Sequence, residues 1–190
     1  MTPALRLLAR SCDSLNTAIG RTVAWFALAM VLVQFAVVVL RYVFGVGFVT
    51  LQESMNYLHG FMYLFGAGYT LLVIGHVRVD ILYREASARS KAWIDLAGTI
   101  CLLLPVCVLV IWASWGPVIQ SWSNLEGSAE TSGIPAVFLL RTAIPVFGVL
   151  MIVQGISVAA RSLLVLAGFE DEGLAAQAAG TGDDVRELGP

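Results

Sequence analysis

Residues 22–40, TVAWFALAMVLVQFAVVVL, decide the fold, because Gln34 is the one strongly polar side chain among them. A helix of about 20 such residues crosses the hydrocarbon core of a bilayer. Arg41 and Tyr42 follow directly, and this pairing suits the boundary between membrane and water. We therefore predict a transmembrane helix over about 22–44.

The composition of the whole chain, like residues 22–40, indicates a membrane protein. Of its 190 residues, 58% are hydrophobic and 13% are charged, whereas about a quarter of the residues of a soluble domain are charged. The net charge is −2, and the sequence lacks the clusters of lysine and arginine with which nucleic-acid-binding proteins contact a phosphate backbone. We expect membrane lipids as the surroundings and no nucleic acid as a partner.

Three further apolar runs follow the first. They predict helices over about 55–75, 92–119 and 136–167, separated by glycine-bearing or charged stretches. Pro105 and Pro145 lie inside the last two helices, and Pro105 should bend the helix over 92–119, because proline has no backbone N–H. The expected fold class is an all-α integral membrane protein with four transmembrane helices.

The predicted domain organisation places this four-helix part at residues 22–168. Residues 1–21 are expected to form a cytoplasmic N-terminal segment. Residues 169–190 are acidic and rich in alanine and glycine, and we expect a disordered cytoplasmic tail there.

Basic residues set the expected orientation, since lysine and arginine are retained in the cytoplasm. They gather before the first span and between the second and third spans, at Arg6, Arg10, Arg21, Arg78, Arg84, Arg89 and Lys91. The loops on the other side hold none. Both termini are therefore predicted to be cytoplasmic.

The two histidines argue against a catalytic or metal centre. His59 and His76 are 17 positions apart, which is about 25 Å along a single helix. One metal ion or haem iron cannot be bound by both from that helix. We expect no catalytic, cofactor-binding or metal-binding residue and no cofactor in this chain.

Ionisable residues inside a membrane point to function by default, but each here has a structural explanation. Glu53 can cap the first turn of the second helix or contact another subunit. His59 can hydrogen-bond a neighbouring helix or a partner chain. Arg141 can extend to the interface or pair with Glu126 or Glu130. The full set of candidate assembly or docking residues is Glu53, His59, His76, Arg78, Asp80, Glu126, Ser128, Glu130 and Arg141.

Small residues on the second helix offer a surface for close helix packing. Gly60, Gly66 and Gly68 permit another helix to approach. The sequence leaves open whether that helix belongs to this chain or to a partner.

An ordered set of short motifs carries a more specific signal. In chain order they are RYVFG at 41–45, QE at 52–53, GAGYTL at 66–71, HVRVD at 76–80, AWIDL at 92–96, EGS at 126–128, GIP at 133–135 and IP at 144–145. This set, over about residues 7–168, resembles the small permease (DctQ-like) family of tripartite ATP-independent periplasmic (TRAP) transporters. The closest likeness is to the branch labelled mannitol/chloroaromatic type.

The resemblance implies one subunit of a three-part importer in the bacterial inner membrane. A periplasmic solute-binding protein captures the solute, which is expected to be an organic acid, and a membrane permease of a large and a small subunit imports it. An ion gradient, commonly sodium, drives that family, and the coupling-ion and solute sites lie in the large subunit. The small subunit is expected to steady the large one.

Two other classes of protein remain as alternatives. A four-helix membrane enzyme acting on lipid or quinone would need Glu53, His59 and Asp95 to converge in one pocket. A small oligomeric channel would need a polar stripe to line its pore.

Overall fold

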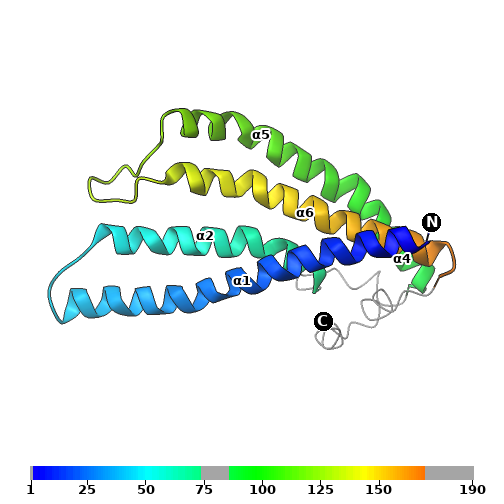
Figure 1. Ribbon diagram of the computed structural model, residues 1–190, viewed down its shortest axis with the longest axis horizontal. Helices are drawn as coiled ribbons and strands as arrows, with labels where there is room; N and C mark the ends of the chain where they lie inside the picture. Colours follow the sequence, from blue (N-terminus) through cyan, green and yellow to red (C-terminus); the bar gives the residue numbers. More distant parts are fainter. Residues whose placement is uncertain (1, 74–85, 170–190) are drawn as a thin grey trace. The chain divides into compact units, whose positions relative to one another are not determined.

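The computed structural model describes residues 2–73 and 86–169, and its regular elements in these ranges are all helical (Figure 1). In chain order they are α1 (Thr2–Tyr42), α2 (Val49–Leu72), α4 (Ala88–Gly98), the π-helical turn η1 (Thr99–Leu103), α5 (Leu104–Ser123) and α6 (Val137–Leu166). The residues predicted to form the acidic tail lie, except for residue 169, outside the described ranges, as do His76, Arg78 and Asp80.

Within residues 2–73 and 86–169, three helical segments are long and apolar enough to cross a membrane: Pro3–Tyr42, Ala88–Ser123 and Val137–Leu166. The prediction of an α-helical membrane protein is therefore confirmed. The remaining long helix, α2, is not among the three, and its first three turns carry the polar residues Gln52, Glu53, Asn56 and His59.

The first helix is longer than the sequence pattern suggested. We expected it from about residue 22, whereas α1 begins at Thr2 and continues to Tyr42 without a break. After Pro3 the early residues include many good helix formers. They also have packing partners, because Ala9 and Asn16 are buried. Tertiary packing therefore extends the helix beyond its apolar stretch.

The chain divides into two compact units, which are described separately. Unit 1 consists of Met1–Thr17, Gly68–Cys107 and Leu150–Pro190. Within its described residues it contains the first part of α1, α4, η1 and the second part of α6. Its buried apolar side chains include Ala92, Leu96 and Leu164.

Unit 2 consists of Ala18–Ala67 and Val108–Val149. It holds the greater part of α1 and α2, most of α5, the first part of α6 and the loop of residues 124–136. Val23, Val118 and Ala143 are buried in it.

A π-helical turn lies directly before Pro105. In η1 the N–H of Leu104 donates to the carbonyl of Thr99, five residues back, and proline supplies no donor at the next position. A π-turn of this kind is a known way for a helix to change its winding. Helices α5 and α6 also contain Pro117 and Pro145.

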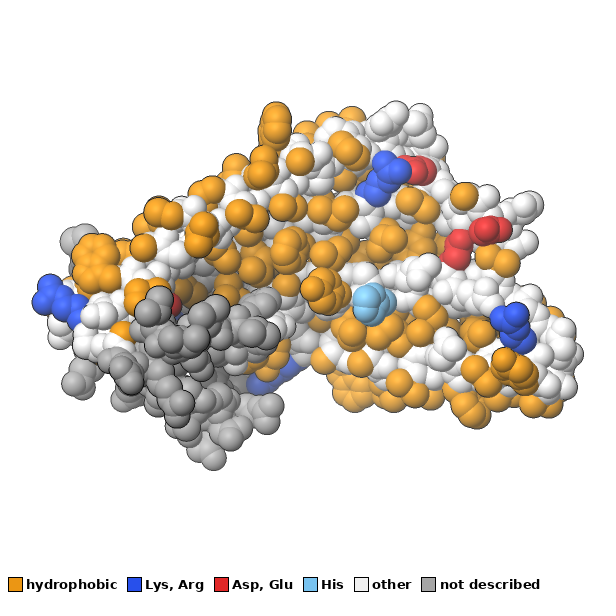
Figure 2. Space-filling model, turned by 180° about the vertical axis from the view of Figure 1, so that it is seen from behind, with side chains coloured by type: hydrophobic (Ala, Val, Ile, Leu, Met, Phe, Trp, Pro, Cys, Tyr) orange, Lys and Arg blue, Asp and Glu red, His pale blue; other side chains and the backbone are white. Residues whose placement is uncertain are grey.

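Large hydrophobic side chains are exposed over α1 and α5, and Figure 2 shows hydrophobic side chains over much of the visible surface. On α1, Trp25 is 70% exposed and Phe35 is 68% exposed, and on α5 Trp112 is 77% exposed. A soluble monomer rarely exposes so much contiguous apolar surface. Such a surface is suited to contact with lipid or with another membrane protein.

The glycines of α2 pack against helices of the same chain. A Cβ at Gly60 would lie 2.8 Å from Leu140 Cδ1 in α6. A Cβ at Gly66 would lie 3.8 Å from Val23 Cγ2 in α1, and one at Gly68 would lie 2.2 Å from Asn16 Oδ1. The close approach that the sequence left open is therefore made inside the chain.

Candidate functional site

In unit 2, Glu53 joins the start of α2 to the loop of residues 124–136. Its Oε1 accepts a hydrogen bond from the Ser128 hydroxyl. Its Oε2 accepts one from the backbone N–H of Ile134 at 2.6 Å. Both carboxylate oxygens are thus engaged by the loop, 75 and 81 positions further along the chain.

Two more side chains of α2 hold the same loop. The Thr50 hydroxyl donates to the Ser132 carbonyl at 2.7 Å, and the Tyr57 hydroxyl lies 3.5 Å from the Ile134 carbonyl. We call this arrangement the loop anchor, and its members are Thr50, Glu53 and Tyr57 of α2 with Ser128, Ser132 and Ile134 of the loop. The loop anchor fixes the conformation of a segment that has no helix or strand of its own.

The hydrogen bonds also stabilise the charge of Glu53. The Ser128 hydroxyl first, and then the Ile134 N–H, lower the pKa of Glu53 below its ordinary value of 4.5. Hydrogen bonds to the charged form of a carboxyl group have this effect. The residue is therefore an anion at neutral pH, and its partners are the loop's own donors.

Gly133 gives the loop room to reach Glu53. A Cβ on Gly133 would lie 2.3 Å from Ser128 Oγ and 2.6 Å from Glu53 Oε2. The Ser128 hydroxyl is oriented in turn, because it accepts a hydrogen bond from the Glu130 N–H at 3.0 Å. Ser128 was a candidate from the sequence, and the structure places it inside the loop anchor.

A second attachment of the loop is the ion pair between Arg141 of α6 and Glu126. Arg141 Nη2 lies 2.6 Å from Glu126 Oε1, and both side chains are about one third exposed. The sequence left Glu126 and Glu130 as alternative partners of Arg141. The structure has Glu126 in that place, whereas Glu130 is exposed.

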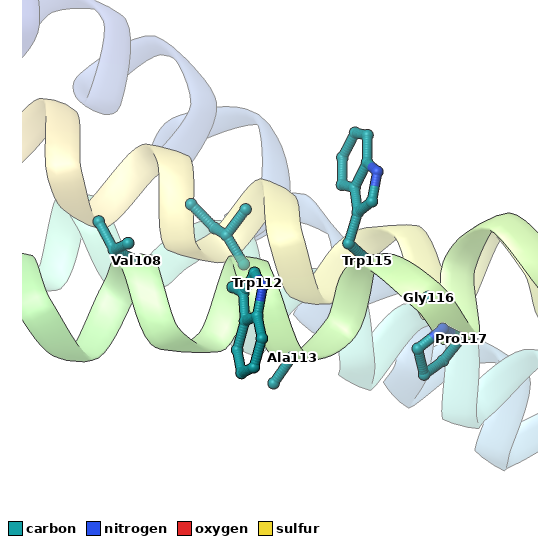
Figure 3. A pocket seen from close by; sticks show the side chains of 7 residues that line it. Val108, Trp112, Ala113, Trp115, Gly116 and Pro117 are labelled. Carbon is teal, nitrogen blue, oxygen red and sulfur yellow. The ribbon is translucent and has the colours of Figure 1, made fainter.

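The tryptophans of α5 have different surroundings. Trp122 donates from its indole Nε1 to Thr142 Oγ1 at 2.8 Å and packs on Phe138 of α6. Trp112 and Trp115 instead border a shallow apolar depression along α5 and project to different sides of the helix in Figure 3. The residues that line the depression all belong to α5 and are mostly apolar.

His59 lies on the exposed side of α2. Its ring stacks on that of Tyr63, one turn later, with 6.2 Å between centroids. Its side chain makes no hydrogen bond to a described residue. His59 and the loop anchor both belong to unit 2.

Unit 1 contains a buried polar network that the sequence analysis did not identify. Asp13 of α1 accepts hydrogen bonds through Oδ1 from Gln154 Nε2 at 3.0 Å and from the Ser157 hydroxyl at 2.7 Å. Its Oδ2 forms an ion pair with Arg161. Asn16 Nδ2 donates to Gln154 Oε1 at 3.0 Å. We call these five residues the Asp13 network.

The Asp13 network is among the most buried parts of the structure. Asn16 and Ser157 are 0% exposed and Gln154 is 1% exposed. The side chains of Arg161 and Asp13 are 16% and 13% exposed. Since buried polar groups are costly unless paired, the network constrains how α1 packs on α6.

A periodicity in the sequence could have revealed this network. Gln154, Ser157 and Arg161 are spaced by three and four positions, which puts them on one face of α6. Asp13 and Asn16 have the same spacing on α1. Residues before 22 precede the apolar stretch, so hydropathy alone gives no reason to pair this face of α1 with that of α6.

The alternative of a membrane enzyme needed three side chains to converge. In the structure, Glu53 accepts hydrogen bonds from Ser128 and Ile134, and the ring of His59 stacks on that of Tyr63. No group of three or more His, Cys, Asp or Glu residues within the described ranges is arranged to hold a metal ion.

Comparison with known proteins gives one family. The model of the tripartite ATP-independent periplasmic transporters, DctQ component, matches residues 30–165. The C4-dicarboxylate TRAP transporter small permease protein DctQ of Vibrio cholerae serotype O1 is 31% identical over 123 residues, which are 63% of this chain. This chain aligns with half of the length of that relative. No solved structure matches the chain.

The matched residues contain α2, α5 and nearly all of α6, and with them the loop anchor and the ion pair of Arg141. The members of this family are transporter components of the inner membrane and not enzymes. The alternative of a membrane enzyme acting on lipid or quinone is therefore excluded. The chain therefore belongs to the DctQ component, or small permease, family of the tripartite ATP-independent periplasmic transporters.

Proposed function

We propose that this chain is the small membrane subunit of a three-part importer and that it steadies a large permease subunit. The family match over residues 30–165 carries this proposal. The exposed apolar surfaces of α1 and α5 support a membrane location for this subunit, because they suit contact with lipid. In this proposal the solute and coupling-ion sites lie in the large subunit, as the resemblance to the family implies.

The proposed topology has four spans with both termini in the cytoplasm. Helix α2 has 24 residues, which is about 36 Å and sufficient to cross a bilayer. The basic residues before the first span and those around Arg89 and Lys91 favour a cytoplasmic location for these two regions. The loop anchor then lies on the periplasmic side.

The solute is proposed to be an organic acid. The relative from Vibrio cholerae is named for C4-dicarboxylates, and the wider family brings solute through a periplasmic binding protein. The driving ion, sodium in this proposal, binds the large subunit. The mannitol/chloroaromatic branch suggested by the sequence motifs stays a prediction.

The subunit assignment is tested by purifying the tagged chain from its native membrane in mild detergent and identifying stoichiometric partners by mass spectrometry. A large permease with many spans should be recovered with it. If the chain emerges alone as a stable oligomer, the subunit assignment is wrong, and ion conductance of that oligomer becomes the next measurement.

The loop of residues 124–136 is proposed to be a docking surface for the periplasmic binding protein. Reversing both Glu126 and Glu130 to lysine would also break the ion pair with Arg141. The exposed Glu130 is therefore the sharper target. Glu130→Lys should lower uptake while assembly stays intact, whereas Glu130→Asp keeps the charge and should retain uptake. Equal uptake by Glu130→Lys at equal protein level would reject docking through this carboxylate.

The segment of residues 76–80 is proposed to act in assembly on the cytoplasmic side. In the sequence, His76, Arg78 and Asp80 alternate with valines, a pattern that can place polar side chains toward a partner and apolar ones toward the membrane. Replacing Arg78 and Asp80 together by alanine should lower recovery of the complex. Unchanged recovery would remove this role.

A further inference from the structure

The exposed side of α2 differs from that of the apolar helices. The exposed residues of α2 are Thr50, Gln52, Asn56, His59 and Tyr63. None of its leucine, phenylalanine, methionine or valine residues falls in that class. On α1 and α5, in contrast, the exposed positions carry side chains such as Trp25, Phe35, Leu109 and Trp112.

The exposed polar residues of α2 lie along one line. Gln52, Asn56, His59 and Tyr63 are spaced by four, three and four positions, so they share one face of the helix. We call these four residues the polar stripe. It begins beside Glu53 and continues for three turns along α2.

The polar stripe has hydrogen-bonding capacity that the described chain does not use. The side chains of Asn56 and His59 make no hydrogen bond to a described residue. Tyr63 is 71% exposed and contributes only the ring stack with His59. In hydrocarbon, a carboxamide and an imidazole without partners are unfavourable.

We propose that the polar stripe is the surface on which a transmembrane helix of the large permease docks, and that this helix presents hydrogen-bonding side chains or exposed backbone carbonyls to Asn56 and His59. The proposal rests on the subunit function proposed above and deepens it by naming the face. The apolar surfaces of α1 and α5 are compatible with lipid, whereas the stripe requires a polar partner. Polar side chains are a recognised means of joining helices in membranes.

The test uses the complete transporter in its native membrane. A photoreactive amino acid replaces Asn56 or Tyr63 in one pair of variants, and Val31 or Phe35 on the exposed apolar face of α1 in a control pair. After irradiation, the tagged chain is purified and its cross-linked partner is identified by mass spectrometry. The stripe positions should cross-link to the permease severalfold more than the α1 positions.

The other outcomes are distinct. Cross-links from α1 but not from the stripe to the permease would overturn this inference and leave the subunit function in place. Cross-links from the stripe to a second copy of the chain, or to lipid alone, would also overturn it. If no permease is cross-linked or co-purified from any position, the proposed function itself fails.

A substitution at the centre of the stripe separates polarity from packing. His59→Leu removes the imidazole and should lower the permease retained on the tagged chain by about fivefold, the size expected for one interhelical hydrogen bond. His59→Gln keeps hydrogen-bonding capacity and should restore most of it. Equal retention by His59→Leu and the wild type would contradict a polar contact at this position.

Discussion

Asp13 and Arg161 lie 148 positions apart and form an ion pair that joins the start of α1 to the end of α6. Asp13 also accepts hydrogen bonds from Gln154 and Ser157. These contacts satisfy the carboxylate in a place where its side chain is only 13% exposed. The pair therefore links residues near the two ends of the described chain, both of which belong to unit 1.

Removing one member of this pair should destabilise unit 1. We expect Asp13→Leu or Arg161→Leu to cost about 3 kcal/mol, because each leaves a buried charge without its partner. The double substitution should cost less than the sum, since it removes both charges. Thermal unfolding of the purified chain in detergent measures all three. Additive losses in the double variant would contradict coupling between Asp13 and Arg161.

A methyl group at Gly68 should disturb the same region. A Cβ there would lie 2.2 Å from Asn16 Oδ1 and 3.4 Å from the Leu150 carbonyl oxygen, so Gly68→Ala should lower stability by about 1–3 kcal/mol. The matched control is Gly98→Ala in α4, which meets no atom within 4 Å. In a helix that change should be neutral or stabilising by up to about 1 kcal/mol. Equal melting temperatures for the two variants would show that α2 does not pack this closely.

The loop anchor should loosen at acidic pH. Its hydrogen bonds place the pKa of Glu53 below the ordinary value of 4.5. The anchor's stabilisation is therefore complete above that ordinary value and is lost as the pH falls through the lowered pKa. A nitroxide label at Ala129, introduced as Ala129→Cys with the native cysteines replaced, should become more mobile as the pH falls through that lowered pKa.

Glu53→Gln provides the control for this titration. The variant lacks the charge, so the label at residue 129 should already be more mobile than the wild-type label at neutral pH, and acidification should increase its mobility less. A wild-type label whose mobility does not change with pH would show that the Glu53 carboxylate does not hold the loop.

The ion pair between Arg141 and Glu126 should tolerate exchange of its charges. Each side chain is about one third exposed, so breaking the pair with Glu126→Lys or with Arg141→Glu should cost only about 0.5 kcal/mol. The double exchange should recover most of that loss. Thermal unfolding and uptake are measured together, because a double exchange that recovers stability but not uptake would assign Glu126 a role in docking.

Packing at the start of α1 explains why the sequence did not predict where this helix begins. The apolar run of residues 22–40 located the first span, but α1 begins at Thr2 because Ala9 and Asn16 have partners in unit 1. Apolar runs report where lipid is tolerated and do not report where a helix begins. The start of α1 depends on contacts with residues about 140 positions away.

The same distinction applies to the candidate residues. Glu53 and Glu126 were identified from charge and position and Ser128 as part of the EGS motif, but the sequence assigned Glu53 to a helix cap or a subunit contact. In the structure, both carboxylate oxygens of Glu53 accept hydrogen bonds from the loop. A pattern of neighbouring residues does not predict a partner 75 or more positions away.

By itself the sequence determined a helical membrane chain and, through its ordered motifs, a small permease of the TRAP type, because hydropathy and motif order are properties of the chain before it folds. Only the tertiary structure decided which polar groups pair. It joined Asp13 to Arg161 and Glu53 to Ser128, and it left Asn56 and His59 on an exposed face of α2. The physical reason is that pairing depends on distances created by helix packing, which residue order does not specify.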